Sequence, residues 1–220
     1  MNMKSITTLI VMLLIALMLS CASRQGKYVD YYSEMFKYYN NRAFDHFPED
    51  IFIQEYGFSL LQIRWYSHLM NALEEPSIYQ QKNNDICKVF RFTWLRSFHK
   101  PIAVRLVVNN DSTGVMYIKK SDGRGGYSSG ELIINNIKEL VEVKTLNFLY
   151  LLENRHFWEL PIHDPEDLLG RDGAQWIVEG LWEGKYHIVD RWSPIDGPVR
   201  DLGLYLLFLS ELDIYEGDIY

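Results

Sequence analysis

Short segments of alternating apolar and polar residues after residue 87 constrain the fold of this chain more than any other feature. A period of two is typical of β-strands with one buried face, and turn-forming residues such as the stretch 109–114 separate the segments. The pattern predicts strands over residues 89–94, 102–108, 115–119, 132–134, 174–180 and 186–192. Most of the core must therefore be built on a β-sheet.

Leucine and aromatic residues at helical spacing predict helices over residues 58–73 and 144–153, and residues 29–39 show similar spacing. A last helix is expected after Asp196, which can cap it, with Pro198 in its first turn. That helix is apolar nearly all round, so we expect it to be buried. Together the patterns predict an α+β fold: an antiparallel sheet, made of a meander and a C-terminal hairpin, is packed by helices and preceded by an N-terminal helical segment.

The first residues have the pattern of an export signal. Lys4 precedes an unbroken apolar run over residues 9–19, and Ser20 and Cys21 follow at once. The run is shorter than the roughly 20 residues that a membrane-spanning helix needs, but it suits a signal peptide. Ser20-Cys21 resembles the bacterial lipobox, although Met18 stands where leucine is usual. Residues 1–20 are therefore predicted to be a lipoprotein signal peptide, with acyl chains such as palmitate attached at Cys21.

Composition divides the rest of the chain into segments. Residues 21–27 are a short tether, and residues 28–84 are an N-terminal helical segment. Pro76 and the polar stretch 80–84 mark a boundary, after which residues 85–220 form the α+β domain.

Charge and cysteine content limit the partners and the chemistry. The formal net charge is −7, which argues against nucleic-acid binding, because that binding depends on basic residues that neutralise phosphates. Attachment to a membrane would rest on the acyl chains. Besides Cys21, the only cysteine is Cys87, so no intramolecular disulfide framework is possible and Cys87 is expected to be a buried thiol.

The C-terminal hairpin holds the only candidate catalytic residues, which are His187, Glu179 and Asp190. A three-residue loop with Gly184 in the left-handed conformation would place His187 opposite Glu179 on the more polar face of the hairpin. A histidine facing a carboxylate can act as a general base. The same pair is also an ordinary cross-strand charge pair, and a two-residue turn at Glu183-Gly184 would separate the two residues.

Other motifs indicate no catalytic or metal centre. The acidic loop around Asp164 and Asp172 lacks the spacing of a calcium loop. The Gly-rich stretch 121–130 lacks the Gly-Lys-Ser/Thr ending of a phosphate loop, so we expect a mobile connection there. Neither a metal nor a cofactor is predicted.

Three segments carry a resemblance to known sequences: 91–101, 172–176 and 186–194. They resemble a group of uncharacterised bacterial exported proteins, over roughly residues 89–220. The resemblance implies no activity and no functional residues, but it directs attention to residues 172–194.

Three functions are compatible with the sequence. The first is a non-enzymatic, lipid-anchored protein of the cell envelope that binds a protein partner, with Trp182 and Tyr127 at loop tips as candidate contacts. The second is a hydrolase-like envelope enzyme that uses His187 with Glu179 or Asp190. The third is an immunity or inhibitor protein. Ala22 after Cys21 favours the outer membrane, facing the periplasm, if the organism has two membranes.

Overall fold

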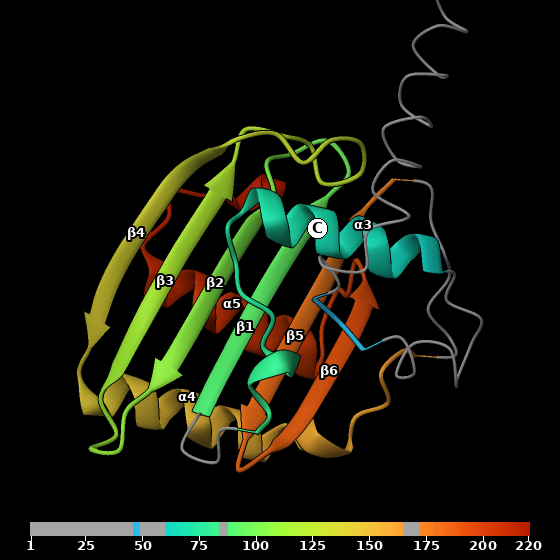
Figure 1. Ribbon diagram of the computed structural model, residues 1–220. Helices are drawn as coiled ribbons and strands as arrows, with labels where there is room; N and C mark the ends of the chain where they lie inside the picture. The colour runs from blue at the N-terminus through green and yellow to red at the C-terminus, as the bar shows by residue number, and fades with distance from the viewer. Residues whose placement is uncertain (1–45, 49–59, 84–87, 165–171) are drawn as a thin grey trace, which may run out of the picture. The chain divides into compact units, whose positions relative to one another are not determined.

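The computed structural model describes residues 46–48, 60–83, 88–164 and 172–220. Its strands are β1 (Lys88–Arg96), β2 (Ile102–Val108), β3 (Gly114–Ser121), β4 (Leu132–Leu140), β5 (Ala174–Trp182) and β6 (Lys185–Trp192). They form one antiparallel sheet in the order β4-β3-β2-β1-β5-β6 (Figure 1). Strands β1 to β4 are the predicted meander, and β5 and β6 are the predicted hairpin, which lies beside β1. The α+β fold is confirmed.

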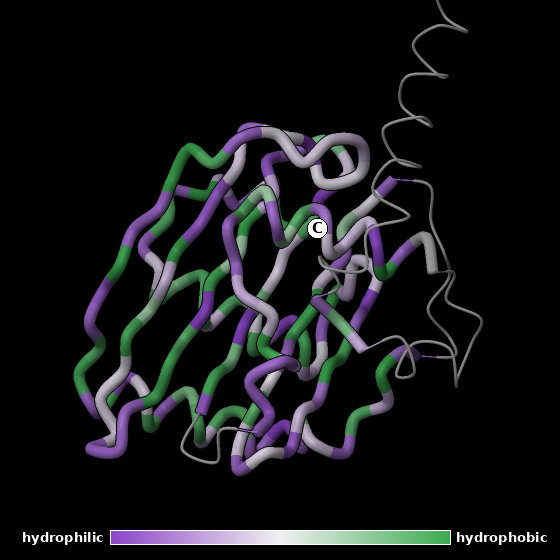
Figure 2. The backbone as a smooth tube through the Cα atoms, viewed as in Figure 1, coloured by the Kyte–Doolittle hydropathy of each residue, from purple (hydrophilic) through white to green (hydrophobic). Residues whose placement is uncertain are grey.

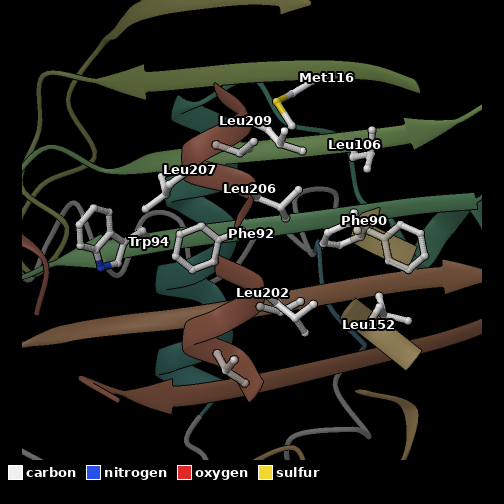
Figure 3. Close-up of a cluster of buried hydrophobic side chains, with 14 of the residues drawn as sticks. Phe90, Phe92, Trp94, Leu106, Met116, Leu152, Leu202, Leu206, Leu207 and Leu209 are labelled. Carbon is white, nitrogen blue, oxygen red and sulfur yellow. The ribbon is translucent and has the colours of Figure 1, made fainter. Parts of the chain in front are cut away.

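Helices cover both faces of the sheet. Helix α3 (Leu60–Ala72) lies on one face, and α5 (Pro198–Ser210) lies on the other with α4 (Glu142–Asn154) beside it (Figures 1 and 3). Short 3₁₀ turns occur at Tyr79–Gln81, Phe157–Glu159 and Glu216–Asp218. Contacts group Phe44–Tyr220 into one compact unit, so α3 packs in the same unit as the sheet, although the sequence places it in a separate segment before residue 85.

The larger core lies between the sheet and α5 (Figure 3). Alternate residues of β1 supply Phe90, Phe92 and Trp94, all fully buried, because side chains two apart along a strand point to the same face. Helix α5 comes close to this layer at Gly203, where a Cβ atom would lie 2.8 Å from the Phe92 ring and 2.9 Å from Trp176. The absence of a side chain at Gly203 therefore sets how closely the helix packs on the sheet.

The smaller core lies between the sheet and α3. From α3 it takes Ile63, Tyr66, Leu69 and Met70, and the next residue after the helix, Leu73, also belongs to it. The sheet residues opposite are Leu95, Ala103, Ile177 and Ile188. Hydrophobic and hydrophilic residues succeed one another along the central strands even though both faces are covered (Figure 2). The hydrophilic residues on the α3 face include buried charged groups, which are described below.

Three local predictions differ from the structure. Asp196 does not cap α5. The N-cap position is occupied by Gly197 (φ 91°), and no side chain makes a capping hydrogen bond there. The helix is also not buried all round, since Phe208 is 74% exposed. Strand β4 continues to Leu140, well past the predicted end at residue 134. The prediction stopped short because the exposed residues Asn135 and Asn136 interrupt the alternation of apolar and polar residues that predicts a strand.

Candidate binding surface

The turn of the C-terminal hairpin decides where its candidate residues point. Glu183 (φ 50°) and Gly184 (φ 75°) are both left-handed and form a two-residue turn between Trp182 and Lys185. This is the turn that suits the right-handed twist of a hairpin. In the resulting register Glu179 pairs with Ile188, and His187 pairs with Gly180.

The prediction that His187 faces Glu179 is therefore wrong. His187 lies on the face covered by α4 and α5, whereas Glu179 lies on the face covered by α3. Asp190 lies on the α3 face as well, because residues 187 and 190 are separated by an odd number of positions along β6. The sheet thus separates the imidazole from both carboxylates.

His187 has a structural environment. Its Nε2 donates a hydrogen bond to the carbonyl of Leu160 at 3.0 Å. The rings of Phe157 and Trp158 lie 5.1 and 6.2 Å from the imidazole centroid. Burial lowers the pKa of His187, so the ring is neutral near pH 7. The histidine ties the segment after α4 to β6.

Glu179 belongs to a buried ion network. Its carboxylate accepts hydrogen bonds from Arg91 Nε at 2.7 Å and from the Tyr186 hydroxyl at 3.0 Å. Burial lowers the pKa of Arg91, but Glu179 and Glu75 more than offset this effect, and the net shift is upward. Burial and the adjacent Glu179 raise the pKa of Tyr186. Glu179 is therefore the ion-pair partner of Arg91.

Glu75, just after α3, extends this network to the neighbouring strands. It contacts Arg91 at 3.3 Å, Arg105 Nε at 2.8 Å and Lys119 Nζ at 3.8 Å. Arg91 also donates to the Pro76 carbonyl at 2.7 Å. Strands β1, β2, β3 and β5 are thus joined to the segment after α3. The sequence contains a signal that was missed: Arg91 and Arg105 interrupt apolar strands at positions on the α3 face.

Asp190 is also covered by α3. Its carboxylate accepts a hydrogen bond from the Tyr66 hydroxyl at 2.8 Å, and Gln62 donates to the same hydroxyl at 2.7 Å. Burial, and then the charge of Asp190, raise the pKa of Tyr66. This chain of hydrogen bonds holds α3 on β6.

The two predicted binding residues differ in exposure. Trp182 packs edge-on against Phe90 with a centroid distance of 6.4 Å, and the Lys88 ammonium lies 4.8 Å above its ring. Trp182 is therefore half-buried and packs against the edge of the larger core. Tyr127 is 50% exposed and stacks on Phe98, which is 52% exposed, with a centroid distance of 5.7 Å. Phe98 and Tyr127 are called the aromatic pair below.

The Gly-rich stretch 121–130 holds the aromatic pair in place. Arg124 and Ser128 form a small antiparallel bridge, and Gly125 N–H donates to the His99 carbonyl at 3.1 Å. A Cβ atom on Gly125 would lie 2.7 Å from the backbone of Arg96, so only glycine permits this close approach. The stretch is therefore a hydrogen-bonded turn packed on the β1–β2 loop rather than an irregular connection.

Basic residues lie in the same loops and on the adjoining strands. Lys100 and Arg124 are exposed, and Lys120 is half-buried. Burial, and then the charges of Arg96 and Lys100, lower the pKa of Lys120, which indicates that these cations are close together. The aromatic pair thus has positive charge near it, although the chain as a whole is acidic.

The acidic loop is only partly described. Asp164 lines a hollow of about 660 Å³ at the start of α5, together with Arg191, Trp192 and Ile195. Arg191 donates to the carbonyls of Pro161 and Ile162 at 2.9 Å each. Within the described ranges, no three His, Cys, Asp or Glu side chains are grouped so that they can hold a metal ion.

The predicted lipidation site and thiol, Cys21 and Cys87, lie outside the described residues. None of the helices in the described part of the chain is long and apolar enough to cross a membrane.

No protein-family model matches this chain, and no curated protein is significantly similar to it. The resemblance of residues 89–220 to uncharacterised bacterial exported proteins stays a prediction.

Proposed function

We propose that this protein is a lipid-anchored binding protein of the bacterial cell envelope, whose aromatic pair contacts a partner protein. The observation that supports the proposal is the stacking of Phe98 on Tyr127 while each ring remains about half exposed. Large aromatic side chains supply most of the binding energy in many protein interfaces. The two rings also keep a fixed geometry, because the Gly125 contact joins their loops. Little conformational entropy is then lost on binding.

The neighbouring charges favour a partner with acidic groups around an apolar contact. Lys100 and Arg124 are exposed in the two loops that carry the rings. Asp122 lies in the same loop as Arg124 and its carboxylate accepts the amide of Glu131 at 2.8 Å, and Asp218 lies 3.5 Å from His99, so the cations are interspersed with acidic groups. Complementary charges of this kind speed association and weaken as salt is added. An immunity or inhibitor role would be one form of such binding.

The enzyme alternative loses its basis in the described residues, because the sheet separates His187 from Glu179 and Asp190. Each of the three side chains also has a structural hydrogen bond of its own.

The binding proposal is tested by replacing Tyr127 with a photocrosslinking phenylalanine analogue in intact envelopes. We expect a discrete crosslinked product that Phe98→Ala reduces by more than about tenfold, which is the usual effect of losing an interface hot spot. The matched control places the analogue at Tyr150, which is 71% exposed on α4. Equal crosslinking at both positions, or no effect of Phe98→Ala, would rule out the aromatic pair as the contact.

The anchor is tested separately with Cys21→Ala. We expect wild-type protein to take up an alkyne-labelled palmitate analogue and to sediment with membranes, and the variant to do neither. Labelling of the variant to the wild-type level would show that Cys21 is not the acylated residue.

A further inference from the structure

Strand β4 is an open edge of the sheet. In the described part of the chain it pairs only with β3, and it lies outermost on its side of the sheet (Figure 1). An unpaired edge presents a row of backbone N–H and C=O groups to any strand that approaches it. This edge is therefore a ready template for strand addition.

The opposite edge, β6, is covered instead. The amide of Asp190 donates to the carbonyl of Ile162 at 2.7 Å, and His187 and Arg191 bind the carbonyls of Leu160 and Ile162. Carbonyl groups of residues 160–162 thus accept hydrogen bonds from β6 along this edge. Among the residues that the structure describes, one edge of the sheet is covered and the other is accessible.

The usual guards against edge pairing are missing from the middle of β4. Proline is absent from it, and the single irregularity in its pairing with β3 lies near its start, at Lys120/Ser121. Lys138 does not point outward as a guard, because its ammonium binds the Leu209 carbonyl at 3.0 Å and the carboxylate of Glu211 on its own subunit. Ile137 is 66% exposed in the middle of the strand.

The occupant that fits this edge is a second copy of the same chain, and two facts determine the register of the pairing. First, the regular part of β4 runs from Ile134 to Leu140, opposite Lys120 to Gly114, and its central residue is Ile137. Second, a symmetric antiparallel pairing must centre on a residue. Directly opposite residues are both hydrogen-bonded or both not, and the two kinds alternate along a strand.

Centring the pairing on Ile137 makes the edge self-complementary. Ile137 then lies opposite Ile137 of the second copy, and the whole regular segment is paired. The other opposing pairs are Asn136 with Lys138, Asn135 with Glu139, and Ile134 with Leu140. Apolar residues meet apolar residues, the Asn135 amide can donate to the Glu139 carboxylate, and no like charges are opposed.

The other centres from Asn135 to Glu139 are worse. A centre at Lys138 or at Glu139 puts like charges opposite each other, and a centre at Asn135 does the same for Glu131 and Glu139. A centre at Asn136 puts Ile134 opposite Lys138 and Ile137 opposite Asn135.

We propose that two copies of this protein associate through antiparallel β4–β4 pairing about a two-fold axis at Ile137, which joins their sheets into one. The inference does not depend on the aromatic pair, which lies in the loops and not on the strand edge. Either proposal can therefore fail alone.

The test is disulfide trapping in the full-length chain with Cys87→Ser as background. Opposed residues of an antiparallel pair have Cα atoms about 4.5–5.5 Å apart, which a disulfide can span. After mild oxidation of isolated membranes, Ile137→Cys should give a covalent homodimer at least tenfold more than Ile195→Cys, whose parent residue is 88% exposed outside β4. Tryptophan fluorescence checks that each variant is folded.

The register has its own control. Asn135→Cys alone should not crosslink, because its counterpart in the second copy is Glu139, whereas Asn135→Cys combined with Glu139→Cys should. The proposal is overturned if Ile137→Cys crosslinks no better than Ile195→Cys. It is equally overturned if Asn135→Cys alone crosslinks as well as Ile137→Cys, or if the trapped species contains a different protein.

Discussion

Buried charges on the α3 face are the most unusual residues of this protein. Arg91, Glu75 and Glu179 have no side-chain exposure, and Arg105 and Lys119 have little. Removing charges from water costs free energy that the pairing must offset, so such networks are sensitive to the loss of one member. Here the network joins the residues after α3 to four strands.

Replacing Glu179 with glutamine should destabilise the protein strongly. The substitution keeps the shape of the side chain but leaves the buried Arg91 with only Glu75 as an anionic partner. Breaking a buried ion pair typically costs about 3–5 kcal/mol in free energy of unfolding. Urea denaturation measures the loss. Glu131→Gln, at an exposed position with no ion pair to any residue in the described ranges, is the control and should change stability by less than about 0.5 kcal/mol. Equal effects of the two substitutions would contradict a structural role for the network.

His163 makes stability depend on pH. Burial, and then the charge of Arg191, lower the pKa of His163 from 6.5 to about 4. The unfolded chain therefore takes up a proton as the pH falls through 6.5, while the folded protein does so only near 4. The contribution of His163 to stability is complete above pH 6.5 and is lost as the pH falls toward 4.

His163→Gln should flatten this dependence. The difference in free energy of unfolding between wild type and variant should shrink steadily from about pH 7 to about pH 4, as urea titrations at several pH values would measure. His156→Gln, at a side chain that is 80% exposed, should keep the wild-type slope. A constant difference for His163→Gln would show that the histidine titrates normally in the folded protein.

At the scale of elements, two glycines determine how a hairpin and a helix are placed. Gly184 permits the two-residue turn that sends His187 and Glu179 to opposite faces. Gly203 lets α5 approach Phe92 and Trp176. In both places a backbone position without a side chain determines how larger residues are arranged.

Gly203→Ala should destabilise the protein, although alanine is the better helix former. The added methyl group would lie 2.8 Å from the Phe92 ring, and overpacking of this kind costs about 1–3 kcal/mol. The gain in helix propensity is at most about 1 kcal/mol. Thermal unfolding should show a lower Tm. Asn147→Ala, at an exposed position in α4, should leave the Tm unchanged or raise it. A higher Tm for Gly203→Ala would mean that α5 can move away from the sheet without loss.

At the scale of the whole molecule, sheet and α3 depend on each other. The sequence suggests a domain that starts at residue 85, but contacts group Phe44–Tyr220 into one unit. A chain that starts at residue 85 would lack Tyr66 and Glu75, so Asp190 would lose the Tyr66 hydroxyl and Arg91 would lose one of its two carboxylate partners.

We therefore expect residues 44–220, produced alone, to unfold cooperatively on heating. Residues 85–220 should aggregate or show no cooperative transition. Circular dichroism and differential scanning calorimetry distinguish the two outcomes. If residues 85–220 unfold with the same Tm as the longer chain, α3 is not part of the folding unit.

Local patterns were enough to predict most of the elements. The period-two alternation in β1 and β2 and the leucine spacing in α4 and α5 reflect which side chains must leave water, and that information is written along the chain. Edge strand β4 was predicted too short, because the consecutive exposed residues Asn135 and Asn136 interrupt the alternation that predicts a strand.

The candidate site depended on relations that no local pattern contains. A two-residue turn in place of a three-residue loop moved His187 to the opposite face from Glu179, because side chains alternate across a sheet. Phe98 and Tyr127 come from different loops, and only the packing of Gly125 on Arg96 brings them together.

By itself, the sequence determined the fold class and the expectation of an export signal that ends at Cys21. The tertiary structure alone decided that Glu179 and Asp190 are structural partners under α3, and that Phe98 and Tyr127 form an exposed pair. The physical reason is that burial and propensity act on each residue along the chain, whereas charge pairing and exposure depend on which distant segments pack together.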